Sequence, residues 1–144
     1  MKNTLKHIFL MLLVITIGSG CSKTPSPAIS SQVDQAFIQD IAVLDINAKD
    51  VIVSKAIPKT VVDATTGNER LDVAGTPLTI TVTVKTGTDL TNLNIRCTLS
   101  GQSKFAKVNP IMGYYTDASQ PKTYTITSQT GKNINTYTVK VVTQ

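Results

Sequence analysis

Few side chains in this chain could perform catalysis, and most of those are carboxylates. The 144 residues include one histidine, His7, two cysteines, Cys21 and Cys97, and nine acidic residues, of which Glu69 is the one glutamate. Ser–His and Cys–His nucleophile pairs need an imidazole base, and zinc sites need histidine or several cysteines. Because His7 lies in a leader segment described below, we expect neither kind of site in the folded part.

The remaining chemical possibilities are paired carboxylates and oxygen ligands for a cation. Nothing in the sequence marks a carboxylate pair, and no glycine-rich phosphate loop is present. The stretch "DATTGNE", residues 63–69, could offer oxygens to Ca²⁺, but it has too few acids for an EF-type loop and is typical of a hairpin turn. We therefore expect no enzyme activity, no cofactor and no metal.

The leader segment has the three parts of a secretory signal peptide. Lys2 and Lys6 form a basic head, residues 8–17 form an apolar run, and Gly18, Ser19 and Gly20 precede Cys21. The apolar run is shorter than the roughly 20 residues that span a bilayer, which disfavours the alternative of a retained membrane anchor. We expect residues 1–20 to be removed.

The same residues resemble a bacterial lipoprotein signal, in which small residues precede a cysteine that receives a lipid. Ser19, Gly20 and Cys21 fit this pattern, whereas Gly18 stands where an aliphatic residue is usual. The resemblance implies lipidation at Cys21, with acyl chains such as palmitate that hold the protein in the membrane. It also implies a cell-envelope location at the outer membrane, with the periplasmic or surface face undecided. An acylated Cys21 would leave no thiol for a disulfide with Cys97.

Residues 21–36 are rich in serine and proline, which predicts a tether, and residues 37–144 form the predicted domain. Without Lys2 and Lys6, 12 basic residues of the original 14 remain against 9 acidic ones. These basic residues are scattered rather than clustered, so we expect no nucleic-acid partner.

From residue 76 onward, apolar and polar residues alternate, which predicts strands with one buried face. The alternating stretches are "TPLTITVTVK", "LNIRCTLS", "KTYTITS" and "NTYTVKVVT", with Tyr124 and Tyr137 on inward positions. The last two should form a hairpin across the turn at 129–133. Further strands are expected at 50–57 and on both sides of the "TTGN" turn. Residues 32–46 could be strand or helix, and we favour a strand at 38–46.

Strands with one solvent-exposed face, joined by short turns, are typical of antiparallel sheets, and two such sheets pack as a sandwich. The C-terminal part also resembles an immunoglobulin-like (E-set-like) module found in surface and periplasmic lipoproteins of gut Gram-negative anaerobes. The resemblance rests on "GTDLTNL" at 87–93, on Asp117 and Pro121, and on the two Tyr-Thr-aliphatic strands. The fold class is therefore predicted as an all-β, antiparallel immunoglobulin-like β-sandwich of about seven strands.

The predicted function is a non-enzymatic structural or adhesion-type module, which is what the resemblance implies. The alternative is a glycan-binding accessory protein of a polysaccharide uptake system, because aromatic faces can stack on sugar rings. Tyr114, Tyr115 and Phe105 are the candidate contacts, although adjacent residues of an extended chain point opposite ways. Cys97 is expected to be a small buried hydrophobe. The expected partners are the membrane, through Cys21, and either a glycan or another envelope protein.

Overall fold

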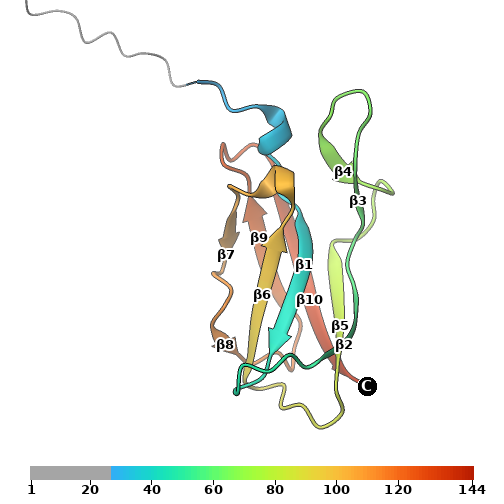
Figure 1. Cartoon of the computed structure of the whole chain (residues 1–144), viewed down its shortest axis with the longest axis vertical. Coiled ribbons are helices and arrows are strands. Elements are labelled where there is room, and N and C mark those ends of the chain that lie inside the picture. Colours follow the sequence, from blue (N-terminus) through green and yellow to red (C-terminus); the bar gives the residue numbers. More distant parts are fainter. Residues whose placement is uncertain (1–26) are drawn as a thin grey trace, which may run out of the picture.

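A computed structural model describes residues 27–144 of the chain (Figure 1). The predicted signal peptide, the lipidation site Cys21 and the first part of the predicted tether lie outside the described residues. Within residues 27–144 there is no α-helix, and two short 3₁₀-helices, η2 (Ser31–Val33) and η3 (Gly101–Ser103), stand beside the strands. The all-β prediction is therefore confirmed.

The described part of the chain forms ten strands. In chain order they are β1 (Ile38–Leu44), β2 (Ile52–Ala56), β3 (Thr60–Val62), β4 (Glu69–Leu71), β5 (Thr79–Val84), β6 (Leu93–Leu99), β7 (Lys107–Asn109), β8 (Tyr115–Thr116), β9 (Lys122–Thr127) and β10 (Ile134–Thr143). The alternating stretches match β5, β6, β9 and β10, and the favoured strand at 38–46 matches β1. The sequence did not predict β7 and β8, which are too short to show an alternating pattern.

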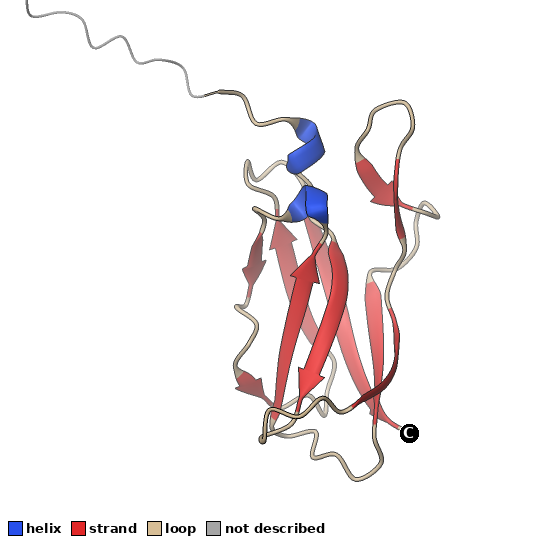
Figure 2. Cartoon of the chain, in the orientation of Figure 1, coloured by secondary structure: helices blue, strands red, loops and turns tan. Residues whose placement is uncertain are grey.

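The strands form two sheets and a small ribbon (Figure 2). One sheet has the order β1-β6-β8, the other β2-β5-β10-β9-β7, and β3 pairs only with β4. Every pairing is antiparallel except that of β10 with β5, which is parallel. This pair corrects the fully antiparallel expectation. Turn signals reveal only pairings between successive strands, and β5 and β10 lie far apart in the sequence.

The core lies between the two sheets and consists of the residues on the inward phase of the alternation. Side chains from both sheets fill it, among them Ile41, Val43, Ile80, Val82, Val84, Leu93, Ile95, Tyr124, Ile126, Tyr137 and Val139. Burial of each such aliphatic side chain contributes about 1.5–3 kcal/mol, so this shared face holds the sandwich together.

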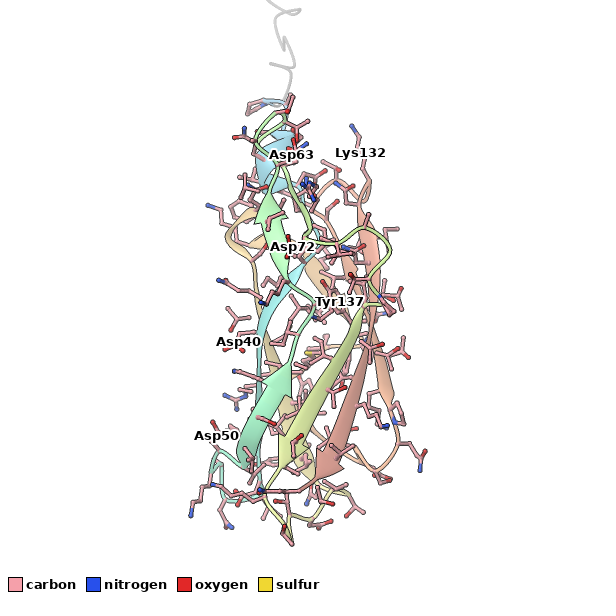
Figure 3. All side chains as sticks on the ribbon, turned by 90° about the vertical axis from the view of Figure 1, so that its right-hand side faces the viewer. Asp40, Asp50, Asp63, Asp72, Lys132 and Tyr137 are labelled. Atoms are coloured by element: carbon pink, nitrogen blue, oxygen red, sulfur yellow. The ribbon has the colours of Figure 1, made fainter. Side chains whose placement is uncertain are left out.

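Tyr137 connects the two sheets through a hydrogen bond as well as by packing. Its side chain projects from β10 and is fully buried, and its hydroxyl oxygen accepts a hydrogen bond of 3.2 Å from the backbone N–H of Ile38 on β1 (Figure 3). The β1–β6 register shifts between Ile38 and Asp40, so a local irregularity accompanies this contact. Burial raises the pKa of Tyr137 to about 12.

Hydrogen bonds join Asp34, near the beginning of the described chain, to the turn between β9 and β10. The carboxylate of Asp34 accepts hydrogen bonds from the backbone N–H (2.9 Å) and the hydroxyl of Thr130, and Asn133 donates a 2.6 Å bond to the Asp34 carbonyl. Residues 34–36 are buried, so the packed domain includes three residues that the sequence analysis assigned to the tether. The first described residues lie toward one end of the long axis and the C-terminal residue toward the other (Figure 1).

Candidate functional site

Tyr114 directly precedes β8 and Tyr115 is the first residue of that strand, and both present their rings to solvent. Tyr114 is 72% exposed and Tyr115 is 47% exposed. The sequence expectation that only one ring would be available is thus not met. Since β8 pairs only with Leu93 and Asn94, at the beginning of β6, the two rings lie at that end of the sandwich.

Backbone and side-chain hydrogen bonds from β6 hold this segment in place. The N–H of Gly113 donates to the carbonyl of Ile95 over 2.8 Å, and the buried Asn94 amide donates to the carbonyl of Gly113 over 2.7 Å. Gly113 has a φ of 95°, a backbone conformation that glycine adopts without a steric cost. The two tyrosines that follow are therefore displayed by a fixed backbone.

A cavity of about 240 Å³ opens beside the two rings, and Lys122 and Thr123 of β9 contribute to its lining. The hydroxyl of Tyr115 also lies 3.4 Å from the carbonyl oxygens of Asp45 and Ile46 in the β1–β2 loop. An aromatic face next to a small polar recess can support a flat ligand and hydrogen-bond its edge.

Phe105 does not join the tyrosines. It is 52% exposed between η3 and β7, where the ammonium of Lys104 lies 4.9 Å from its ring centroid. η3 follows the end of β6, whereas Tyr115 pairs with Asn94 near its beginning, and the strand between them spans about 20 Å. The predicted group of three aromatic residues is corrected to Tyr114 and Tyr115, because β6 separates Phe105 from them.

A second concavity, of about 560 Å³, lies between β6 and β7 and was missed by the sequence analysis. Its lining residues are Arg96, Cys97, Lys107, Val108, Ile111, Met112 and Gly113. Cys97 is half-buried here, and burial raises the pKa of its thiol. Cys97 packs against the core as a partly buried residue, so the expectation of a buried hydrophobe is met only in part. The sequence did not predict the concavity, because residues 104–113 show no periodic pattern of apolar and polar residues.

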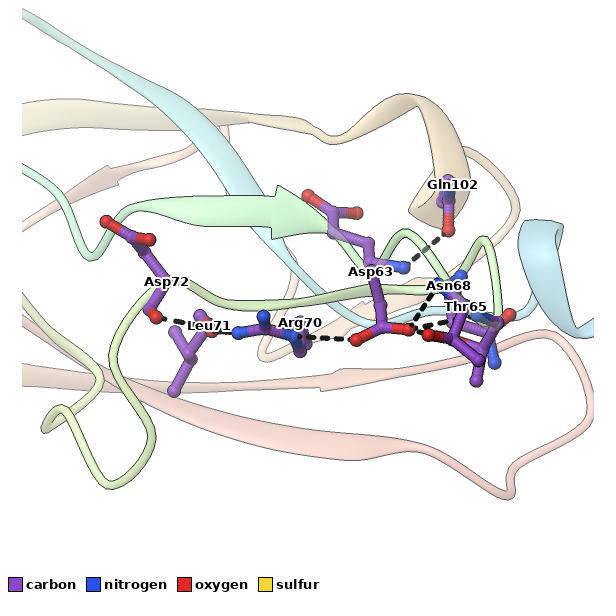
Figure 4. A network of polar contacts seen from close by, with 9 residues as sticks. Asp63, Thr65, Asn68, Arg70, Leu71, Asp72 and Gln102 are labelled. Atoms are coloured by element: carbon purple, nitrogen blue, oxygen red, sulfur yellow. Dashed lines mark hydrogen bonds and ion pairs between the residues drawn. The ribbon is translucent and has the colours of Figure 1, made fainter.

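The "DATTGNE" stretch forms the turn of the β3–β4 ribbon, and its carboxylates are occupied by protein donors (Figure 4). Asp63 accepts hydrogen bonds from the N–H groups of Thr66 (2.9 Å) and Thr65 (3.0 Å) and from Nε of Arg70 (3.2 Å). These contacts, led by the Thr66 N–H, lower the pKa of Asp63 to about 2. The oxygens considered for Ca²⁺ therefore stabilise the turn.

Glu69 is buried and fastens the ribbon to the sandwich. Its carboxylate accepts hydrogen bonds from the hydroxyl groups of Thr60 (2.6 Å) and Ser100, while its backbone N–H donates to the side chain of Gln102 over 2.7 Å. The one glutamate of the chain thus has a structural role that the sequence did not reveal.

A third, polar depression of about 330 Å³ lies between the β1–β2 and β5–β6 loops. Its two carboxylates are engaged locally: Asp45 accepts from the N–H of Lys49 and Asp89 from the N–H of Thr91, each over 2.9 Å. Asp89 thus forms a side-chain-to-backbone turn. The hydroxyl and N–H of Thr91 lower the pKa of Asp89.

The carboxylates of the described residues are dispersed. Asp40, Asp50, Asp63 and Asp72 lie at different heights along the long axis (Figure 3). Between residues 27 and 144, no group of three or more His, Cys, Asp or Glu side chains is placed to hold a metal ion. In the same range, no helix has the length and apolar character required to cross a membrane.

The solved structures similar to this chain include two from Bacteroides species. One, from Bacteroides thetaiotaomicron, is described as a candidate glycoside hydrolase; it has 27% sequence identity and a TM-score of 0.42, and the match covers 65% of this chain but 24% of that one. The other, a candidate secreted protein from Bacteroides fragilis, has 16% identity and a TM-score of 0.43, with 81% and 99% coverage. These scores are too low to transfer a function. No curated protein matches the chain.

The family comparison is more informative. Residues 60–141, which run from β3 nearly to the end of β10, match the family model described as SGBP, N-terminal. The abbreviation denotes a starch- or glycan-binding protein, and the family belongs to the surface or cell envelope of Bacteroidetes. The match extends over more than half of the sequence and includes both tyrosines of the candidate site. The chain therefore belongs to the SGBP, N-terminal family.

Proposed function

We propose that the protein is a glycan-binding accessory protein of a polysaccharide uptake system, and that Tyr114 and Tyr115 form its sugar contact. The observation that supports this most directly is the display of two exposed aromatic rings, on a backbone fixed to β6, beside a cavity with polar groups. The family match makes this alternative preferable to the structural or adhesion-type role that the sequence favoured.

The contact consists of largely exposed rings beside a small cavity, an arrangement that fits an extended polymer better than a free monosaccharide. A ring stacked on Tyr114 would leave both ends of a chain in solvent. The exposed hydroxyl of Tyr114 and the ammonium of Lys122 could hydrogen-bond sugar hydroxyl groups at the edge of the sugar ring that stacks on Tyr114. The module would hold a polysaccharide without cleaving it.

Binding to a panel of plant and host polysaccharides, measured by affinity electrophoresis of the full-length protein, tests this proposal. We expect at least one polysaccharide to retard the protein, and Tyr114→Ala to weaken that binding tenfold or more, equivalent to about 1.4 kcal/mol. Phe105→Ala is the matched control, because it removes an exposed aromatic ring outside the site. Equal losses for the two variants, or no retardation by any polysaccharide, would count against the proposal.

We also propose that a lipid on Cys21 anchors the protein in the outer membrane. Acyl chains add about 0.8 kcal/mol per buried methylene, so a multiply acylated N-terminus would hold firmly. Mass spectrometry of the mature N-terminus should find cleavage before Cys21 and a mass increase from the acyl groups. Cys21→Ser should move the protein from the membrane to the soluble fraction. A free thiol at residue 21 in the native protein would contradict this part of the proposal.

A structural spacer is the second candidate, favoured by one observation. The first described residues and the C-terminal residue lie toward opposite ends of the long axis, so the module could hold its C-terminal end away from a membrane anchor at Cys21 (Figure 1). A spacer predicts no glycan binding but a dependence on length. Insertion of a second copy of residues 34–144 changes the length and would then impair the function of the cell-surface system, whereas Tyr114→Ala would leave that function unaffected.

A further inference from the structure

Two of the concavities adjoin each other and together form a groove. Ile111 and Met112 line both the 560 Å³ space between β6 and β7 and the 240 Å³ space beside Tyr114 and Tyr115. The groove follows the side of the sandwich where β7 and β8 lie one after the other (Figure 1). We call these two adjoining concavities the edge groove. Two neighbouring concavities can receive successive units of a polymer.

The charges that line the edge groove all have the same sign. Arg96, Lys107 and Lys122 are among its lining residues, which include no aspartate or glutamate. Asp117 lies close to Lys122, but it is not among the lining residues, and its carboxylate accepts a 2.9 Å hydrogen bond from the N–H of Ser119. A ligand in the groove therefore meets three cations over an apolar floor that includes Val108 and Met112.

Arg96 is oriented by the protein rather than free to move. Its Nε donates a hydrogen bond of 2.9 Å to Oδ1 of Asn94, which is buried and also holds the carbonyl of Gly113. In the described part of the chain, the two terminal nitrogens of the guanidinium have no hydrogen-bonding or ion-pair partner. Two parallel N–H groups of arginine match the two oxygens of a carboxylate, which makes this pairing stronger and more specific than that of lysine.

We infer that the edge groove binds an acidic polysaccharide, in which a uronate carboxylate pairs with Arg96 while a neighbouring sugar ring stacks on Tyr114. This inference rests on the proposed function and specifies its substrate class. Asn94 positions both parts of the site, because the same side chain orients the guanidinium and ties down the segment that displays the tyrosines. Lys107 and Lys122 add attraction at the two ends of the groove.

Polygalacturonate and its fully methyl-esterified form provide the test, because they share a backbone and differ in the carboxylate charge. With the full-length protein, we expect the acidic form to bind at least tenfold more tightly in isothermal titration calorimetry, and its affinity to fall as salt is raised. Arg96→Gln should remove this preference, and Arg96→Lys should restore only part of it. Lys140→Gln, which removes an exposed charge of β10 that does not line the groove, should bind like the native protein. Thermal unfolding of each variant checks that the fold is intact.

The other outcomes separate this inference from the function on which it rests. If both forms bind equally and Tyr114→Ala weakens both, the glycan function stands and the charge preference is overturned. If neither form nor any neutral polysaccharide binds, both proposals fail. If Arg96→Gln and Lys140→Gln reduce binding to the acidic form equally, the attraction comes from net charge alone, and the assignment to the edge groove is wrong.

Discussion

Asn94 and Gly113, nineteen residues apart, are joined by a hydrogen bond of 2.7 Å from the side-chain amide to the backbone carbonyl. The bond fixes the segment that displays Tyr114 and Tyr115 to the central strand of the β1-β6-β8 sheet. The other atom of the same amide group, Oδ1, accepts the Nε–H of Arg96. One buried side chain thus determines the position of both the aromatic and the charged part of the candidate site.

Asn94→Ala should destabilise the protein and weaken glycan binding together. The substitution leaves the Gly113 carbonyl and the Arg96 Nε–H without this partner, which costs about 1–3 kcal/mol where the group is buried. Urea denaturation measures the loss of stability, and affinity electrophoresis measures the loss of binding. Thr98→Ala, on an exposed position of the same strand, should change neither. A variant with native affinity would show that Asn94 does not position the site.

Tyr137→Phe should lower the free energy of unfolding by about 1–3 kcal/mol, because the N–H of Ile38 is then buried without its acceptor. Tyr124→Phe is the matched control: the two residues are direct cross-strand partners and both are buried, but the Tyr137 hydroxyl bridges the sheets. Chemical denaturation should show a larger loss for Tyr137→Phe. Equal losses would mean that the hydrogen bond to Ile38 contributes little.

Acid should destabilise the domain, and Asp63 should account for part of the effect. Its pKa is about 2 in the folded protein against 3.8 as the ordinary value, because Thr66, Arg70 and Thr65 donate to the ionised carboxylate. A folded-state pKa below the unfolded one stabilises the protein above pH 3.8, and this contribution disappears as the pH falls toward 2. Urea midpoints measured between pH 2 and pH 6 should decline over this window. Asp63→Asn should make the decline shallower, and an unchanged slope would contradict the prediction.

Gly67→Ala should destabilise the β3–β4 ribbon more than Gly75→Ala. Both glycines have positive φ, 71° and 78°, where a side chain costs about 1 kcal/mol. A Cβ at Gly67 would also lie 2.5 Å from Nε2 of Gln32, which must move, whereas a Cβ at Gly75 meets no atom within 4 Å. Hydrogen exchange of the ribbon amides measures the difference. Equal effects would show that the Gln32 side chain adjusts freely.

Local pattern was sufficient to predict most of the strands, because the residues that face the core recur at every second position. Ile80, Val82 and Val84, for example, are inward by their spacing alone and are fully buried in the structure. The Asx turn at Asp89 was also predictable, since an aspartate carboxylate in a turn lies close to the backbone N–H two residues later. The leader and Cys21 likewise depend on sequence alone, and their role stays a prediction.

The candidate site depended on pairings between distant residues, which the sequence does not display. Phe105, Tyr114 and Tyr115 are close in the sequence, yet β6 places the phenylalanine at one end and the tyrosines at the other. The edge groove exists because β7 joins one sheet while β8 joins the other. Neither strand has an alternating pattern, so only the packed sandwich brings Arg96 within one groove with the two tyrosines. The sequence by itself determined an all-β chain, and the tertiary structure decided which of its polar and aromatic side chains share a surface, because that choice is made by strand pairing.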